Sequence, residues 1–297
     1  MVGITISQHG GRFKALISNN LPLSIKYLTF GYCYNQPTDN LINHHNIKEL
    51  TFGDMYNHIT NHLPPNITHL TFGNCYDQPT NNLPHNITHL GFGDNYNHDS
   101  NHLPPHIRKL MFGRFYNRIS DHLPPTITHL VFGMAYNQIS DHLPPSIKYL
   151  TFGGYYNQPT NNLPDGIITI KFGYDYNQIT DHLPPSTRRI IFGYCYNQIT
   201  DHLPPSTRRI IFGDCYNQLT EHLPLGVKHI TFGYHYNQPM DKLPSRITSI
   251  KLENDKHPYI SHLYSYYNLT MINVYTTMMN EHIHKNIHNL MMKKYRC

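Results

Sequence analysis

The sequence lacks tryptophan, strong charge and long apolar stretches. Charged residues make up 14% of the chain and the formal net charge is +5, too small and mixed for a dedicated nucleic-acid binder. No stretch approaches 18 apolar residues, and no charged leader precedes an apolar run, so neither a membrane span nor a signal peptide is expected. Five cysteines in 297 residues do not resemble a secreted disulfide framework. These absences favour a soluble protein of a reducing intracellular compartment.

What the chain has instead is one short unit repeated almost end to end. Residues 181–200 read DHLPPSTRRIIFGYCYNQIT, and residues 201–220 differ from them only at Asp214 and Leu219. A Phe-Gly pair marks each copy, with one step of 22 residues followed by nine steps of 20. Its phenylalanines are Phe30, Phe52, Phe72, Phe92, Phe112, Phe132, Phe152, Phe172, Phe192, Phe212 and Phe232. A decayed copy ends at Leu252.

A period near 20 residues is too short for paired helices and predicts a solenoid with one strand per coil. Leu70 and Phe72 flank Thr71 in the alternation of a half-buried strand and are expected to face the core. The same core positions are held by Leu130, Phe132, Ile190, Phe192, Ile210 and Phe212. The following glycine is expected to supply a bend, and Pro-Pro pairs make the opposite wall extended and irregular.

The array occupies residues 21–252, with a short segment at either side. Residues 1–20 are expected to cap the first coil, as solenoids require. Residues 253–297 are expected to form a small helical cap, because two sets of apolar residues there have helical spacing. These sets are Ile260, Leu263, Tyr264 and Tyr267, and Ile283, Ile287, Leu290 and Met291. The predicted fold is mainly β: a leucine-rich-repeat-like solenoid of about eleven to twelve 20–22-residue coils with a helical C-terminal cap.

Two motifs carry a resemblance to a known family. The Ile-x-x-Leu-x-Phe segment resembles the Leu-x-x-Leu-x-Leu segment of leucine-rich repeats, and tetrapeptides such as Tyr34-Asn35-Gln36-Pro37 follow the Phe-Gly pair. In these the chain is similar to the FNIP repeat family of social amoebae and giant amoeba-infecting viruses. The resemblance implies an interaction role rather than chemistry. Many relatives carry an N-terminal F-box, which implies a ubiquitin-ligase substrate receptor, but no such segment is found here.

Residues repeated in every coil form ladders along a solenoid, about 5 Å apart. One is expected to be structural, because stacked amides can bond each other and the turn backbone. It comprises Asn35, Asn57, Asn97, Asn117, Asn137, Asn157, Asn177, Asn197, Asn217 and Asn237. Asp77 interrupts this ladder, which predicts either a locally weak layer or a compensating backbone donor.

A second ladder is made of histidines, beside an acidic row. The histidines are His62, His102, His122, His142, His182, His202 and His222, and the acids are Asp121, Asp141, Asp181, Asp201, Glu221 and Asp241. Without a fixed cysteine or carboxylate pair, the histidines are interpreted as a hydrated edge and not as a metal site. Below about pH 6 they would charge and repel each other, which predicts lower thermal stability at pH 5 than at pH 7.5.

Basic residues gather where the two most similar repeats meet. Arg188, Arg189, Arg208 and Arg209 come from these repeats, and Lys171 and Lys228 lie one coil away on either side. At least one arginine of each pair is expected to reach the strand face, where Tyr149 and His129 can serve as anchors. A solvated patch left by recent duplication is the alternative. Cys195 and Cys215 occupy neighbouring coils and are expected to remain reduced.

No catalytic constellation, cofactor site or metal site is recognised in the sequence. The predicted function is a non-enzymatic protein–protein interaction scaffold that binds through the strand face, with substrate recognition as one form of that role. The expected partner is an unidentified protein, related to ubiquitin ligases if the adaptor role holds. The chain is expected to be a monomer in the cytoplasm, that of the host if it is viral. The alternatives are anion or nucleic-acid binding by the Arg188–Arg209 cluster, and a self-associating structural rod.

Overall fold

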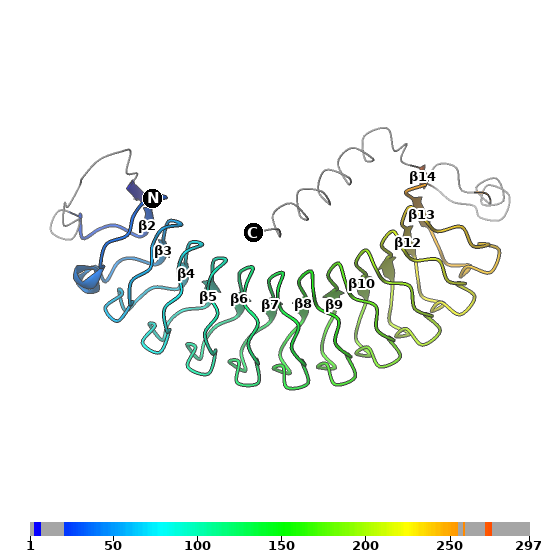
Figure 1. The fold of residues 1–297 in the computed structure, drawn as a ribbon, viewed down its shortest axis with the longest axis horizontal. Helices are drawn as coiled ribbons and strands as arrows, with labels where there is room; N and C mark the ends of the chain where they lie inside the picture. Colours follow the sequence, from blue (N-terminus) through cyan, green and yellow to red (C-terminus); the bar gives the residue numbers. More distant parts are fainter. Residues whose placement is uncertain (1–2, 7–20, 255–257, 259–270, 275–297) are drawn as a thin grey trace, which may run out of the picture.

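The computed structural model describes residues 3–6, 21–254, 258 and 271–274 of the 297. These residues form one parallel sheet of 14 strands whose order follows the sequence. The strands lie on the inner side of a curved array of coils (Figure 1). They are β1 (Gly3–Ile6), β2 (Tyr27–Phe30), β3 (Glu49–Thr51), β4 (His69–Thr71), β5 (His89–Gly91), β6 (Lys109–Met111), β7 (His129–Val131), β8 (Tyr149–Thr151), β9 (Thr169–Lys171), β10 (Arg189–Ile191), β11 (Arg209–Ile211), β12 (His229–Phe232), β13 (Ser249–Leu252) and β14 (Met271–Val274).

The strands stack in register, so equivalent residues of successive coils meet. Leu70 of β4 lies opposite Leu50 of β3 and Leu90 of β5. The core positions expected from the sequence are buried, with no more than 3% of any of them exposed. They are Leu70, Phe72, Leu130, Phe132, Ile190, Phe192, Ile210 and Phe212. The prediction of a mainly β, leucine-rich-repeat-like solenoid is therefore confirmed.

Stacked aromatic rings fill the space behind the sheet. Within each coil the Phe and Tyr rings are nearly parallel, with centroids 3.7 Å apart in the case of Phe132 and Tyr136. Between coils, phenylalanine centroids are 5.4–6.0 Å apart and tyrosine centroids 6.0–6.3 Å. Parallel strands, by contrast, are spaced about 4.8 Å. Because the spacing increases away from the strands, the array curves with the sheet on its concave side.

The buried tyrosines are joined to the preceding coil by hydroxyl bonds. The hydroxyls of Thr180 and Tyr196 lie 2.9 Å apart, and an equivalent pair recurs in most coils. Serine can make the same bond, as Ser100 does by accepting from the Tyr116 hydroxyl at 3.2 Å, but the coil that contains Ser140 differs. Ser140 lies 3.4 Å from the hydroxyl of Tyr136 and donates to the carbonyl of Gln138, and the buried Tyr156 hydroxyl finds no partner among the described residues. Burial disfavours the phenolate and raises the pKa of Tyr136 to about 12.

The turn expected after each Phe-Gly pair is present, as between Gly153 and Tyr156, but the glycine is required for close packing and not for an unusual backbone conformation. Gly153 does not adopt a left-handed φ; instead, a Cβ added to it would overlap the carbonyl group of Gly133 in the preceding coil. The same holds along the array: at Gly173, for example, the overlapping group is the carbonyl of Gly153. A column of glycines therefore lets successive backbones touch.

The ends of the array extend the same sheet. Strand β1 pairs with β2, and Ile4 packs against the core from within the segment expected to be a cap. A 3-10 helix, η2 (Asp39–Asn43), accommodates the longer second coil. At the other end, β14 pairs with β13, which places a strand inside the segment expected to be helical, so the helical cap is not supported. The apolar sets of the two expected helices lie outside the described residues.

Candidate interaction surface

Three rows of outward-pointing residues cover the concave side. The first and third residues of strands β2–β13 form what is here called the strand face. The second residue of each strand points inward and is buried. The residue directly before each strand forms the edge row. A short parallel strand buries alternate residues, so every coil contributes two side chains to the strand face and one to its margin. The surface is continuous over twelve coils as a result.

Positive charge is concentrated on these rows. Together they hold twelve of the chain's 23 Lys and Arg residues, but only one of its 18 acidic residues, Glu49. The basic residues are Lys26, Lys48, Arg108, Lys109, Lys148, Lys171, Arg188, Arg189, Arg208, Arg209, Lys228 and Lys251. A weak net charge for the whole chain thus conceals a strongly basic concave face, which attracts anionic partners.

Arg189 and Arg209 form the centre of this face. They lie opposite each other in the paired strands β10 and β11. Arg209 is exposed, and Arg189 is partly covered, with its Nε buried and without a hydrogen-bond partner among the described residues. Within that described part, no carboxylate comes within ion-pair distance of either arginine. Two adjacent guanidinium groups without counter-ions are suited to a carboxylate or phosphate that accepts paired bonds.

The other members of the expected cluster are only partly brought together. Lys171 is the third residue of β9 and lies opposite Ile191, one coil from Arg189. Arg188 and Lys228 are exposed in the edge row. Arg208 belongs to the same row, but its Nη1 donates to the carbonyls of Pro205 at 3.1 Å and Thr207 at 3.0 Å.

The guanidinium of Arg208 is therefore committed to its own backbone, a detail that the sequence did not predict. It lies against Gly226 of the next coil, where a Cβ would collide with Nη1. The four arginines do not form one cluster: two lie on the strand face, and two lie at its edge.

Stacked aromatic side chains occupy the other half of the strand face. The rings of His129 and Tyr149, which the sequence predicts to lie on one face, are stacked 4.3 Å apart. A second pair, His69 and His89, stacks at 4.0 Å and was missed. The signal was present, because both histidines hold the first strand position in adjacent coils. Ring surfaces beside cations are typical of interaction sites.

A threonine fixes each of these imidazoles. The hydroxyl of Thr128 donates to the carbonyl of Arg108 at 3.2 Å and also lies 2.9 Å from Nδ1 of His129. Because a hydroxyl has a single proton, Nδ1 must be the donor in the second bond. The geometry assigns the Nδ1-protonated tautomer and leaves Nε2 as an acceptor for a partner.

Acid is expected to destabilise the protein through the strand face. Burial and the neighbouring charges of His69, Lys109, His129 and Arg108 lower the pKa of His89, and burial and Lys109 lower the pKa of His129. A lowered folded-state pKa means that the unfolded chain binds more protons. Stability is then fully present above the unfolded value near 6.5 and is lost as the pH falls towards the folded value.

Thermal melting at pH 7.5 and pH 5 checks this expectation. The wild type should melt at a lower temperature at pH 5, and a His89→Gln/His129→Gln variant should show a smaller difference. Equal pH dependence in both proteins would contradict the assignment.

Two residues of the histidine ladder have a carboxylate neighbour in the preceding coil. Nδ1 of His62 lies 3.1 Å from a carboxylate oxygen of Asp39 in the preceding coil, and Nδ1 of His142 lies 3.5 Å from Asp121. Exposed pairs of this kind contribute little to stability, and the expected acid sensitivity of the ladder stays a prediction.

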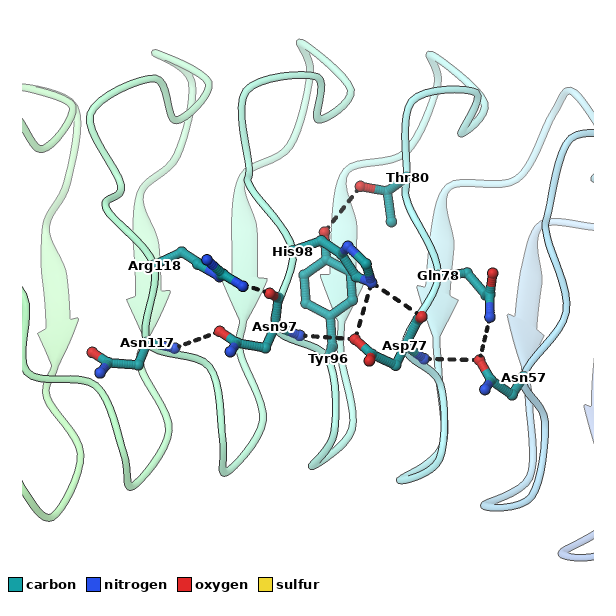
Figure 2. Close-up of polar contacts among 9 residues, drawn as sticks. All are labelled: Asn57, Asp77, Gln78, Thr80, Tyr96, Asn97, His98, Asn117 and Arg118. Carbon is teal, nitrogen blue, oxygen red and sulfur yellow. Dashed lines mark hydrogen bonds and ion pairs between the residues drawn. The ribbon is translucent and has the colours of Figure 1, made fainter.

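The asparagine ladder bonds in a manner that the sequence left open. The backbone N–H of Asn117 donates to Oδ1 of Asn97, and similar bonds of 2.9–3.0 Å recur between neighbouring coils (Figure 2). Only an acceptor is needed. Asp77 therefore fits, accepting from the N–H of Asn97 at 3.2 Å and pairing with His98 at 3.0 Å. Of the two outcomes expected at Asp77, the structure therefore shows the backbone donor, which is the N–H of Asn97.

Other chemistry has no visible site in the described part of the chain. No group of three His, Cys, Asp or Glu residues there is placed to hold a metal ion. Cys33, Cys75, Cys195 and Cys215 are free thiols. No helix among the described residues is long and apolar enough to cross a membrane.

Comparison with known proteins relates this surface to a repeat family. The FNIP Repeat family model matches residues 45–75, 76–115, 116–155, 139–175, 156–195, 176–215 and 216–255. The crystal structure of CroV588, a circular leucine-rich-repeat protein from a giant virus, superposes with a TM-score of 0.74 at 37% identity. The match covers 80% of this chain but only 38% of CroV588.

A further solved structure matches more distantly. YopM from Yersinia enterocolitica WA-314 is 15% identical, with a TM-score of 0.47 over 86% of this chain and 63% of YopM. A search of curated proteins gives no match.

Proposed function

Because this chain belongs to the FNIP repeat family, we propose that it is a non-enzymatic scaffold whose strand face binds an acidic segment of a partner protein. The leucine-rich-repeat-like solenoid is a fold typical of protein–protein interaction. To this general role the proposal adds the binding surface, which is the strand face, and the acidic character of the partner. Its central contacts would be made by Arg189, Arg209 and Lys171, with Lys228 and Arg188 at the margin.

The segregation of charge carries this proposal. Twelve basic residues and one acidic residue share the concave rows, and Arg189 and Arg209 have no carboxylate partner in the described structure. Unpaired guanidinium groups of neighbouring strands would bind Asp or Glu side chains in bidentate fashion. Because the rungs repeat about every 4.8 Å, an extended acidic segment could meet several cations in succession.

The stacked rings supply the apolar part of such an interface. His129 and Tyr149 lie on the same face, and Tyr149 is 43% exposed. Rigid aromatic groups beside arginines are the residues that contribute most to binding at protein interfaces. The same combination also favours a second candidate, single-stranded nucleic acid, whose bases stack on rings while its phosphates contact cations.

Binding to two defined probes tests the proposal. The first probe is a 20-residue peptide of Glu, Asp and Tyr, and the second is a 20-nucleotide single-stranded DNA. An Arg189→Ala/Arg209→Ala variant should bind the peptide at least tenfold more weakly than the wild type. An Arg118→Ala/Arg246→Ala variant removes the same charge away from the strand face and should bind within about twofold of the wild type.

The salt dependence separates the two candidates. Displacement of counter-ions from DNA makes affinity fall steeply with salt, by about 0.7 power of the salt concentration for each phosphate contacted. If DNA binds far more tightly than the peptide, with such a slope, and binding is lost in the Arg189→Ala/Arg209→Ala variant, the nucleic-acid candidate replaces the proposal. Equal losses in the two double variants would remove the strand face from consideration.

A further inference from the structure

A row of exposed apolar residues runs along the wall opposite the sheet. It occupies the position directly before a buried Thr, Ser or Met, and over seven consecutive coils every residue at this position is apolar. This ridge consists of Ile119, Ile139, Pro159, Ile179, Ile199, Leu219 and Pro239. Ile179, Ile199 and Leu219 are 62%, 60% and 52% exposed, although nothing in the packing of the coil requires an apolar residue there. Contiguous exposed apolar surface of this kind marks interaction sites.

Acidic residues border the ridge. Two positions further along, six of the seven coils carry an acidic residue, and the coil of Pro159 carries Asn161. The acidic residues are Asp121, Asp141, Asp181, Asp201, Glu221 and Asp241. An open pocket of about 220 Å³ joins the two rows, lined by Ile199, Asp201, Gln218, Leu219, Glu221 and His222. The outer wall thus combines apolar contact with negative charge, whereas the strand face is positive.

One acidic residue of this border already forms an ion pair with a lysine of the same chain. Nζ of Lys242 lies 2.9 Å from a carboxylate oxygen of Glu221, which raises the pKa of the lysine. Asp181 and Asp201 are exposed, and neither forms an ion pair with another described residue. The acidic border therefore has capacity for cations beside Ile179 and Ile199.

We propose that the ridge and its acidic border bind a cationic amphipathic helix of a partner protein. Inside this wall the buried rings of Tyr196 and Tyr216 are 6.1 Å apart, and the spacing of the coils increases from the strands towards the ridge. Residues four apart in an α-helix rise about 6.0 Å, so an apolar stripe at i, i+4 and i+8 would run alongside Ile179, Ile199 and Leu219. Lys or Arg on one flank of that stripe would reach Asp181, Asp201 and Glu221.

This surface is separate from the proposed strand-face site in both position and charge. An acidic segment suited to Arg189 and Arg209 would be repelled by Asp181 and Asp201, and a cationic helix would be repelled by the strand face. One protein can then hold two different partners, one on each wall. Failure of either assignment leaves the other untouched.

A designed peptide tests the ridge directly. The probe is a 16-residue helical peptide with leucines at i, i+4 and i+8 and lysines along one flank, labelled for fluorescence anisotropy. Its controls are a peptide of the same composition with the leucines dispersed, and one with glutamate replacing each lysine. The patterned cationic peptide should bind wild type at least tenfold more tightly than either control.

Protein variants locate the binding. Ile179→Asn/Ile199→Asn/Leu219→Asn should weaken binding of the patterned peptide at least tenfold, and Asp181→Asn/Asp201→Asn should weaken it and reduce its salt dependence. The matched control is Leu23→Asn/Tyr32→Asn/Leu225→Asn, which removes three residues of 66%, 64% and 78% exposure outside the ridge and should bind as wild type does. Because all these side chains are exposed, the melting temperatures should stay close to that of the wild type.

Three results would overturn the proposal. They are absence of binding at millimolar peptide, equal affinity for the patterned and dispersed peptides, and unchanged affinity in the ridge variant. Light scattering measures the oligomeric state and so tests whether the ridge binds a second copy of this chain. If the wild type is a dimer and the ridge variant a monomer, the ridge binds a second copy of this chain instead.

Discussion

Gly153→Ala is expected to destabilise the protein by about 3 kcal/mol or more, at the upper end of what overpacking costs. The new Cβ would overlap the carbonyl group of Gly133 and lie 2.9 Å from Cα of Met134. Neither neighbour can easily move, because Met134 accepts the N–H of Tyr155 and the coils on both sides repeat the same contact. The inserted methyl group must therefore separate two coils.

The measurement is urea denaturation, with Gly91→Ala as the matched control. Gly91 lies in β5, and a Cβ there would meet the Thr71 methyl group at an ordinary 3.6 Å. Since alanine is favoured over glycine in a strand, the control should be neutral or more stable by about 0.5–1 kcal/mol. Two transitions in the Gly153→Ala curve would show that the array has broken at that layer. Equal midpoints for the two variants would refute the packing role of the glycine column.

Thr180→Val is expected to cost about 1–3 kcal/mol, the usual cost of leaving a buried hydroxyl unpaired. Thr180 is 1% exposed, and its hydroxyl lies 2.9 Å from that of the fully buried Tyr196. Valine has the same shape, so the packing is retained while the Tyr196 hydroxyl loses its partner. The Thr180→Val/Tyr196→Phe double variant should recover much of the lost stability, because no unpaired buried hydroxyl remains at this position.

Tyr156→Phe is the matched control for this ladder. The Tyr156 hydroxyl is buried without a hydrogen-bond partner in the described structure, so its removal should be neutral or stabilising. Tyr196→Phe should be destabilising instead, since it leaves Thr180 unpaired. Chemical denaturation of the four variants gives the coupling energy. Equal effects of Tyr156→Phe and Tyr196→Phe would show that the hydroxyl bond contributes nothing measurable.

The fold was predictable because one period repeats eleven times. Alternation at Leu70 and Phe72 gives the buried face of a strand, and stacking then follows from the short period. The sequence does not reveal what each repeated polar or small residue touches. Gly153 was expected to be needed for the turn that follows it, whereas what requires a glycine there is the close approach of Gly133, twenty residues away. Such contacts depend on coil-to-coil distance, which the sequence of a single unit does not contain.

The surface was predictable in kind but not in detail. Strand positions identify Arg189, Arg209 and Lys171 as outward-facing, and the structure places them in adjacent strands. Nothing local indicated that Arg208 would turn to the carbonyls of Pro205 and Thr207, since that choice depends on the space above Gly226. The helical cap expected after residue 252 is not supported, because Met271–Val274 within that segment form a strand that pairs with β13.

The asparagine ladder has a direction, and that direction bears on how the array can change in length. Each coil donates a backbone N–H to the asparagine of the coil before it and offers its own asparagine to the coil after it. Any coil that follows can make the same bond, so a whole 20-residue unit can be inserted or deleted without leaving a donor or an acceptor unpaired. The near-identity of residues 181–200 and 201–220 fits such an event. Duplication of a repeat by unequal recombination is therefore compatible with the fold, and the length of the concave surface can evolve one coil at a time.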